Sequence, residues 1–93
     1  MKYYKCKWNS PSKEDPFNLI FEVDDKSYEK RKIEIYKNGK YGYAYDNIEI
    51  NGTRLGKVPL PSIDEIIADK EFEIKEIKNV EFEFLWKLMI SDK

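Results

Sequence analysis

The dipeptide Asn38-Gly39 constrains the fold of this chain more than any other feature of its sequence. It separates two segments of alternating polarity, 31–36 and 40–45, and Asn-Gly between such segments is the strongest short-range signal for a β-hairpin. Both residues tolerate the positive φ that a two-residue type I′ turn requires. The sequence therefore predicts an antiparallel hairpin in which Lys37 pairs with Lys40.

This two-residue turn decides which side chains share a face of the hairpin. With Lys37 opposite Lys40, Ile35 lies opposite Gly42 and Ile33 lies opposite Ala44. The isoleucines then share their face with small residues, which leaves room for a helix to pack there. The other face of the predicted hairpin looks outward and carries Lys32, Glu34, Tyr36, Tyr41, Tyr43 and Tyr45.

Three further segments, 2–8, 17–23 and 71–77, alternate with the period of a half-buried strand. In the first of them Tyr4, Cys6 and Trp8 share the predicted core face, and residues 9–12 end the strand. Together with the hairpin, these segments predict about five strands.

Two helices complete the expected fold. Ser62 is the predicted N-cap of a short helix that ends near Asp69, and Glu65 completes its capping box. The order of elements indicates an α+β domain with a mainly antiparallel sheet and both helices on one face. At 93 residues the chain supports one core, so we expect a single domain spanning residues 1–93. The second helix carries an apolar stripe of Phe82, Leu85, Trp86 and Met89.

The stretch NGTRLGKVPLPSIDEI, residues 51–66, contains two glycines and a lysine in an order that invites comparison with a phosphate-binding loop. A nucleotide P-loop has four residues between its glycines, then Lys and Ser or Thr, with a helix directly behind. Here three residues separate Gly52 from Gly56, Val58 follows the lysine, and Pro-Leu-Pro prevents a helix at that point. The loop is therefore predicted to be a connector whose glycines permit turns.

The composition argues against the commonest catalytic chemistries. The chain has no histidine, and its net charge of -1 gives no electrostatic basis for a nucleic-acid or membrane partner. Cys6 alternates with apolar residues, so a buried side chain is expected rather than a reactive thiol. No cofactor or metal is expected, and the absence of a signal peptide or a long apolar stretch predicts a cytoplasmic protein. The glutamates expected to form a solvated surface are Glu71, Glu73, Glu76, Glu81 and Glu83.

Four segments resemble a family of small bacterial domains of unknown function: MKYYKCKW, RKIEIYKNGKYGYA, NGTRLGKVPLPSIDEI and EFEFLW. The resemblance covers nearly the whole chain, and GTRLGxxPxP is its most specific part. Members of that family often carry Thr just before the last helix, where this chain has Lys78, so Asn79 becomes the expected cap. The resemblance implies no activity.

The candidate binding residues are the outward tyrosines and two cations. Tyrosines on a strand either form cross-strand pairs that stabilise the hairpin, lie beneath the chain's own loops, or form a recognition surface. Arg54, between two glycines, either clamps a carboxylate or phosphate of a ligand or ties its loop to an acidic residue of the same chain. The complete candidate set is Lys32, Tyr36, Tyr41, Tyr43, Tyr45 and Arg54.

These features favour a small non-enzymatic module that binds another protein, for example as an inhibitor or immunity partner of a toxin or effector. A second hypothesis is single-stranded nucleic-acid binding on the Tyr and Lys face, because aromatic rings stack on bases. A third is an enzyme that uses carboxylates, since a fold alone does not exclude catalysis.

Overall fold

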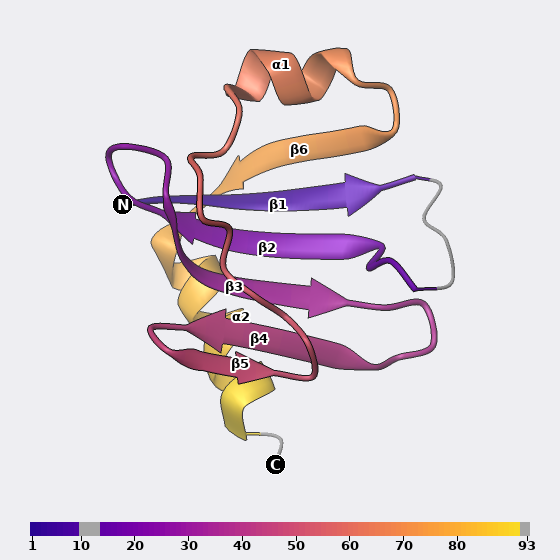
Figure 1. The fold of residues 1–93 in the computed structure, drawn as a ribbon, viewed down its shortest axis with the longest axis vertical. Helices are drawn as coiled ribbons and strands as arrows, with labels where there is room; N and C mark the ends of the chain where they lie inside the picture. The colour runs from indigo at the N-terminus through magenta and orange to yellow at the C-terminus, as the bar shows by residue number, and fades with distance from the viewer. Residues whose placement is uncertain (10–13, 92–93) are drawn as a thin grey trace.

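The computed structural model describes residues 1–9 and 14–91, and its strands form one six-stranded sheet in the order β5-β4-β3-β2-β1-β6 (Figure 1). All neighbouring strands are antiparallel. The α+β class and the antiparallel sheet are confirmed, with one strand more than expected. The predicted break over residues 9–12 lies, apart from Asn9, outside the described residues. The elements are β1 (Lys2–Trp8), β2 (Asn18–Val23), β3 (Glu29–Ile35), β4 (Tyr41–Tyr45), β5 (Ile48–Ile50), α1 (Ile63–Ala68), β6 (Phe72–Ile77) and α2 (Asn79–Ser91).

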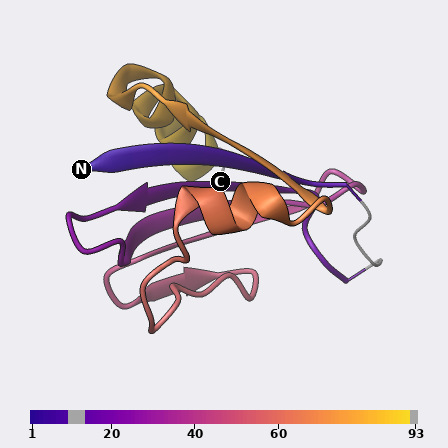
Figure 2. The same ribbon diagram turned by 90° about the horizontal axis from the view of Figure 1, so that it is seen from above.

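The two helices lie on opposite sides of the sheet, as Figure 2 shows, so the prediction that both pack on one face is wrong. Helix α2 covers the face that contains Tyr3 and Ile20, which we call the α2 face. Helix α1 lies over the face that contains Cys6 and Phe21, which we call the α1 face. The reason is that β1 and β2 lie inside the sheet and bury apolar side chains on both faces, whereas the sequence pattern assigned each strand one core face.

The turn between β3 and β4 contains three residues, Lys37, Asn38 and Gly39, so the predicted two-residue turn is wrong. Tyr36 and Lys40 close it: the Tyr36 N–H donates to the Lys40 carbonyl oxygen at 2.9 Å, and the Gly39 N–H donates to the Tyr36 carbonyl oxygen at 3.0 Å. Gly39 has a φ of 87°, whereas Asn38 keeps a negative φ and its side-chain oxygen accepts from the Lys40 N–H at 2.9 Å. This local bond takes the place of the left-handed conformation that a type I′ turn requires at Asn38.

The extra turn residue shifts the pairing of β4 by one position and turns its side chains to the opposite face from the one predicted. Ile33 pairs with Tyr43 rather than with Ala44. Ile33 is fully buried, as expected, but the side chains beside it on the α2 face are rings rather than small residues. Tyr41, Tyr43 and Tyr45 therefore lie under α2.

A second Asn-Gly dipeptide, Asn51-Gly52, adopts the turn that the sequence predicts for the first. Both residues have positive φ (55° and 83°), and the Thr53 N–H donates to the Ile50 carbonyl oxygen at 3.2 Å, as in a type I′ turn. The expectation that Gly52 permits a turn is confirmed. The chain then crosses the α1 face as residues 51–62, which we call the strap and which passes in front of the sheet in Figure 1.

The strap approaches β4 closely because Gly42 has no side chain. Thr53 is 0% exposed against it, and a Cβ atom on Gly42 would overlap the Thr53 hydroxyl oxygen and the Ile50 carbonyl oxygen. The Thr53 hydroxyl is hydrogen-bonded to a Glu34 carboxylate oxygen at 2.9 Å. The strap, which sequence analysis treated as a simple connector, therefore covers the face that was expected to be open.

Both predicted helices form. The Ser62 hydroxyl accepts from the Glu65 N–H at 3.2 Å, which confirms Ser62 as the N-cap of α1. Asn79 does not act as the predicted cap of α2, because it lies within the helix and its side-chain amide donates to the Tyr3 hydroxyl at 2.7 Å. The predicted stripe packs on the α2 face and consists of Phe82, Leu85, Trp86 and Met89.

Candidate functional site

The structure places three of the candidate tyrosines under or beside α2. Tyr43 is 2% exposed, and its ring packs edge-on against Trp86 with centroids 5.6 Å apart. Tyr45 is half-buried and packs edge-on against the same indole at 5.4 Å. The Tyr41 hydroxyl donates to the Met89 carbonyl oxygen at 3.3 Å. The prediction of an uncovered tyrosine face is therefore wrong, and the shifted register of β4 is the reason.

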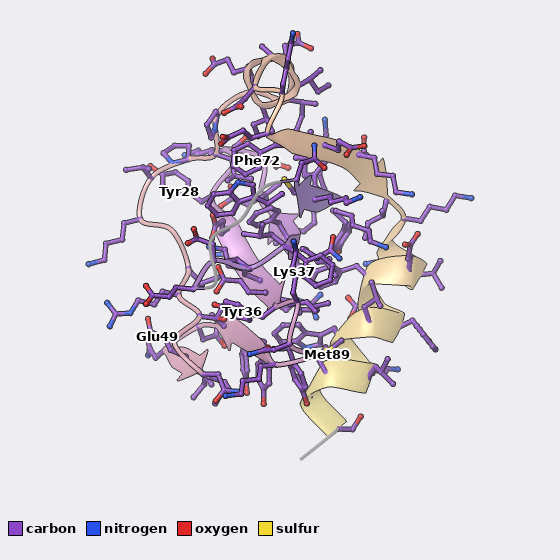
Figure 3. All side chains as sticks on the ribbon, turned by 90° about the vertical axis from the view of Figure 1, so that its right-hand side faces the viewer. Tyr28, Tyr36, Lys37, Glu49, Phe72 and Met89 are labelled. Carbon is purple, nitrogen blue, oxygen red and sulfur yellow. The ribbon has the colours of Figure 1, made fainter. Side chains whose placement is uncertain are left out.

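The remaining candidate residues lie elsewhere in the molecule. Tyr36 closes the β3–β4 turn, and Lys32 lies on the α1 face, where its ammonium group donates to the Arg54 carbonyl oxygen at 2.9 Å. The Arg54 side chain is 78% exposed, with its Nε 3.6 Å from a Glu49 carboxylate oxygen. Figure 3 shows Glu49 and Met89 on opposite sides of the sheet. The six candidates thus do not form one surface.

Arg31 forms an ion-pair network that sequence analysis did not identify. Its guanidinium donates two bonds of 2.7 Å to Glu22 on β2, and bonds of 2.6 and 3.1 Å to Glu83 on α2. The same group lies 4.8 Å from the ring centre of Phe82 and 5.1 Å from that of Trp86. The expectation that Glu83 is simply solvated is wrong, because Arg31 binds it. This network fastens α2 to the sheet and leaves neither carboxylate free for a ligand.

The pKa shifts of Glu22, Glu83 and Cys6 also indicate that these side chains have structural roles. Hydrogen bonds from Arg31 hold the pKa of Glu22 and of Glu83 below the ordinary range, so both carboxylates stay ionised. Burial raises the pKa of the Cys6 thiol, and the expectation that Cys6 is buried is confirmed. A general base works best with a pKa near the operating pH. The pKa shifts of Glu22, Glu83 and Cys6 all move the pKa of these groups farther from neutral pH.

The outward side of α2 carries an exposed apolar row. Val80, Phe84 and Leu88 are 72%, 67% and 53% exposed. At about 100° per residue, Val80 and Leu88 lie about 40° to either side of Phe84, on the side of the helix opposite the buried Phe82 and Trp86. We call these three residues the outer row. A shallow depression beside its end is lined by Tyr41, Leu88, Met89 and Ser91.

Sequence analysis missed the outer row because it assigned the last helix a single apolar stripe. A spacing of four residues separates Val80, Phe84 and Leu88, which is as regular as the spacing of the inward stripe. A helix that is apolar on two sides packs one side against the core of its own domain and leaves the other side exposed for a partner. Plotting every apolar residue of 79–91 on a helical wheel would have found this second row.

A second exposed surface lies on the α2 face where α2 does not reach. In Figure 1, α2 crosses behind the left half of the sheet, away from the right-hand ends of β1 and β6. Lys5 and Lys75 are direct cross-strand partners there, and Lys7 is two residues along the same face. These three residues, which we call the lysine corner, line a depression together with Phe17, Asn18, Glu73 and Ile74.

The lysine corner is electrostatically unbalanced. Like charges directly opposite each other on a sheet destabilise it. Within the part of the chain that the structure describes, Lys5, Lys7 and Lys75 form no ion pair with a carboxylate. Glu73, the cross-strand partner of Lys7, supplies the one negative charge that the described residues contribute to the lining. An anionic group placed in this depression would relieve the repulsion.

The described residues hold no group of three His, Cys, Asp or Glu side chains that could bind a metal ion, and no helix among them is long and apolar enough to cross a membrane. No curated protein and no solved structure matches the chain. A family model matches residues 2–91, which include all six strands and both helices. The chain belongs to that family, whose description is "Domain of unknown function (DUF6881)".

Proposed function

We propose that this protein is a non-enzymatic protein-binding module and that its outer row on α2 enters an apolar groove of a different protein. The observation that carries the proposal is the exposure of Val80, Phe84 and Leu88 in a single row. Contiguous apolar surface on a small domain commonly marks an interaction site. Helices that bind in grooves present anchors one turn apart on one face, which is the arrangement of this row.

The area of the outer row favours a groove over a second copy of the chain. Three partly exposed side chains offer on the order of 300–400 Å² of apolar surface, whereas a stable interface buries about 800 Å² on each partner. Two convex rows in contact would fall well short of that area. A concave partner also contacts the flanks of the outer row. There Glu81, Lys87 and Tyr41, which lines the depression beside Leu88, add surface.

The lysine corner specifies the charge of the partner. It lies on the same side of the sheet as α2, and its lysines form no ion pair with a carboxylate of the described residues. A groove with an acidic rim would place carboxylates near Lys5 and Lys75 while the outer row enters the apolar floor. Opposite charges across an interface accelerate association and select the partner. The proposed partner is therefore a protein with an apolar groove and an acidic rim.

In biological terms, we place this module among small bacterial, cytoplasmic proteins that inhibit or neutralise a toxin or effector. Its support is indirect: a histidine-free chain of 93 residues whose ionic network is structural and whose exposed features suit a protein surface.

The test compares three immobilised forms of the full chain as baits in an extract of the native cell. The first is the wild type, the second carries Val80→Ser, Phe84→Ser and Leu88→Ser, and the third carries Val58→Ser and Ile67→Ser. The third is a matched control, because Val58 and Ile67 are 71% and 57% exposed but lie away from α2. We expect one stoichiometric protein with the wild type and the control, and its loss with the second form.

The captured protein is then purified and its affinity measured by calorimetry at two salt concentrations. We expect Lys5→Gln with Lys75→Gln to weaken binding and to reduce its salt dependence, since the charges act over about a Debye length. Equal capture by the outer-row variant, or a dimer of the isolated chain in light scattering, would overturn the proposal. Tight binding of an oligothymidine by the wild type, lost in the lysine variant, would replace it with the nucleic-acid alternative.

A further inference from the structure

A cavity of about 350 Å³ lies on the α1 face, between α1 and the sheet. Strands β1, β2 and β6 supply its floor, and the end of the strap and α1 supply its roof. Helix α1 buries none of its six residues, so it covers the sheet without filling the space beneath it. The lining residues are Cys6, Leu19, Phe21, Leu60, Pro61, Glu65, Ile66, Asp69, Phe72 and Ile74.

The chemistry of this lining is asymmetric. Eight of the ten residues are apolar or weakly polar, and the charged pair, Glu65 and Asp69, stands four residues apart at the α1 side. Glu65 lines the cavity from within α1 and Asp69 lines it from the C-cap of that helix, where one Asp69 carboxylate oxygen accepts from the Glu71 N–H at 3.0 Å. Within residues 1–9 and 14–91, no lysine or arginine lines the cavity and neither carboxylate takes part in an ion pair.

We infer that this cavity binds a small amphiphile whose apolar chain lies between α1 and the sheet and whose cationic group pairs with Glu65 and Asp69. The volume lies near the lower end of the range of about 300–1,000 Å³ that is typical of small-molecule sites, so the ligand is small. Such sites combine apolar walls with a few polar groups that fix orientation, and here the polar groups are both anionic. This site lies on the opposite face from the outer row and does not depend on the proposed protein partner.

The test uses three probes with the same chain and different heads: n-octylammonium, n-octanol and n-octanoate. Affinity is measured from the chemical shifts of the backbone amides of Leu19, Phe21 and Ile74 in the full chain. Octylammonium should bind about fivefold more tightly than octanol, because two exposed ion pairs together contribute about that factor. Octanoate should bind most weakly.

Cys6 provides an independent readout, since it is the chain's one cysteine and lines the cavity. Bound octylammonium should slow the reaction of its thiol with an aromatic disulfide in a saturable way. The concentration that halves the rate should agree with the affinity from the amide shifts. Shifts without thiol protection would place the probe elsewhere and overturn the proposal.

Two variants and a matched control separate charge from shape. Glu65→Gln with Asp69→Asn should equalise octylammonium and octanol while leaving octanol affinity unchanged. Asp64→Asn with Glu71→Gln removes the same charge from exposed residues outside the lining and should preserve the preference. Ile66→Trp fills the cavity from its α1 side and should weaken all three probes together.

Equal affinity of the wild type for the three heads would overturn the assignment of a cationic ligand. Unsaturable binding of all three probes would overturn the site itself. Loss of the preference in the control variant, to the same extent as in the Glu65 and Asp69 variant, would show that net charge rather than this pair of carboxylates is responsible.

Discussion

The two faces of the sheet differ in the extent of their apolar packing, although the same strands contribute to both. On the α2 face, Phe82 and Trp86 lie on buried rings and isoleucines with almost no exposed surface. On the α1 face, Leu60 of the strap packs against a smaller apolar cluster, and the rest of the strap is held by polar bonds, such as the bond of 2.8 Å from the Gly56 N–H to a Glu29 carboxylate oxygen. Under α1 the contact is incomplete and a cavity remains.

Because of this difference, we expect the α2 face to stabilise the fold and the α1 face to open more easily. Apolar burial stabilises in proportion to area, so the α2 face should carry most of the free energy of unfolding. Hydrogen bonds that replace bonds to water contribute about 1 kcal/mol each, so the strap and α1 can open at small cost. A face that opens easily suits a small-molecule site, and a helix that is rigidly seated suits a protein-docking row.

The largest expected effect is that of Trp86→Ala. The indole contacts the rings of Tyr43, Tyr45 and Phe82, and its removal leaves a cavity in the larger core. Unfolding in urea should show a loss of about 3–5 kcal/mol. Phe84→Ala, an aromatic truncation on the outward side of the same helix, should cost less than about 0.5 kcal/mol. Similar losses in the two variants would contradict the inward and outward assignment of α2.

The next effect is that of Arg31→Met, which keeps the length of the side chain and removes its charge. Glu22 is then buried without its cationic partner, and α2 loses its ionic link to the sheet. Because 21% of the Arg31 side chain remains exposed, we expect a loss of about 2 kcal/mol, below the range for fully buried pairs. An unchanged midpoint of unfolding would show that the network contributes nothing net.

The two carboxylates bound by Arg31, Glu22 and Glu83, also make the free energy of unfolding depend on pH. Arg31 lowers the pKa of Glu22 and Glu83 in the folded state relative to the unfolded state. Their contribution is therefore present above the unfolded pKa, near pH 4.5, and is lost as the pH falls through the lower folded values. Arg31→Met should weaken this loss or reverse it, since protonation then relieves a buried charge. A steeper acid loss in the variant would contradict the assignment.

The sequence predicted the element types better than their faces. Alternation identified β1 and β2, and Ser62 marked the start of α1, because these are local signals. The register of β4 depended on whether Asn38 adopts a positive φ or bonds the Lys40 N–H, and the dipeptide allows both. Because the turn is one residue longer than predicted, Tyr43 lies in the core rather than on the expected surface, and the predicted patch does not form.

The predicted grouping of the candidate residues on one face was wrong for a related reason. Its residues were grouped by strand alternation, so one error in register separated Lys32 from the tyrosines of β4. The Arg31 network joins β2, β3 and α2, and no sequence spacing reports such a contact. The outer row was accessible to sequence reasoning, since Val80, Phe84 and Leu88 follow a simple helical period.

A smaller effect is expected on the α1 face from Gly42→Ala. The added Cβ atom would overlap the Thr53 hydroxyl and the Ile50 carbonyl oxygen, so the strap must move away. We expect a loss of about 1–2 kcal/mol. Hydrogen exchange should accelerate at the amides of Gly56 and Leu60, which bond to Glu29 and to the Ser27 carbonyl oxygen. Equal acceleration at amides of β1 and β2 would mean that the whole sheet is disturbed.

The smallest effect is expected from Ser62→Ala, which removes the bond of 3.2 Å between the Ser62 hydroxyl and the Glu65 N–H. An N-cap contributes about 1 kcal/mol, but α1 buries no residue, so its fraying should change the global free energy of unfolding by less than that amount. The local consequence should be larger: the Ile66 N–H, which bonds to the Ser62 carbonyl oxygen, should exchange faster, and Cys6 beneath α1 should react faster with an aromatic disulfide. Ser62→Asp, which keeps a capping oxygen, should restore both rates. A global loss approaching that of Trp86→Ala would show that α1 is as firmly seated as α2 and that the two faces do not differ.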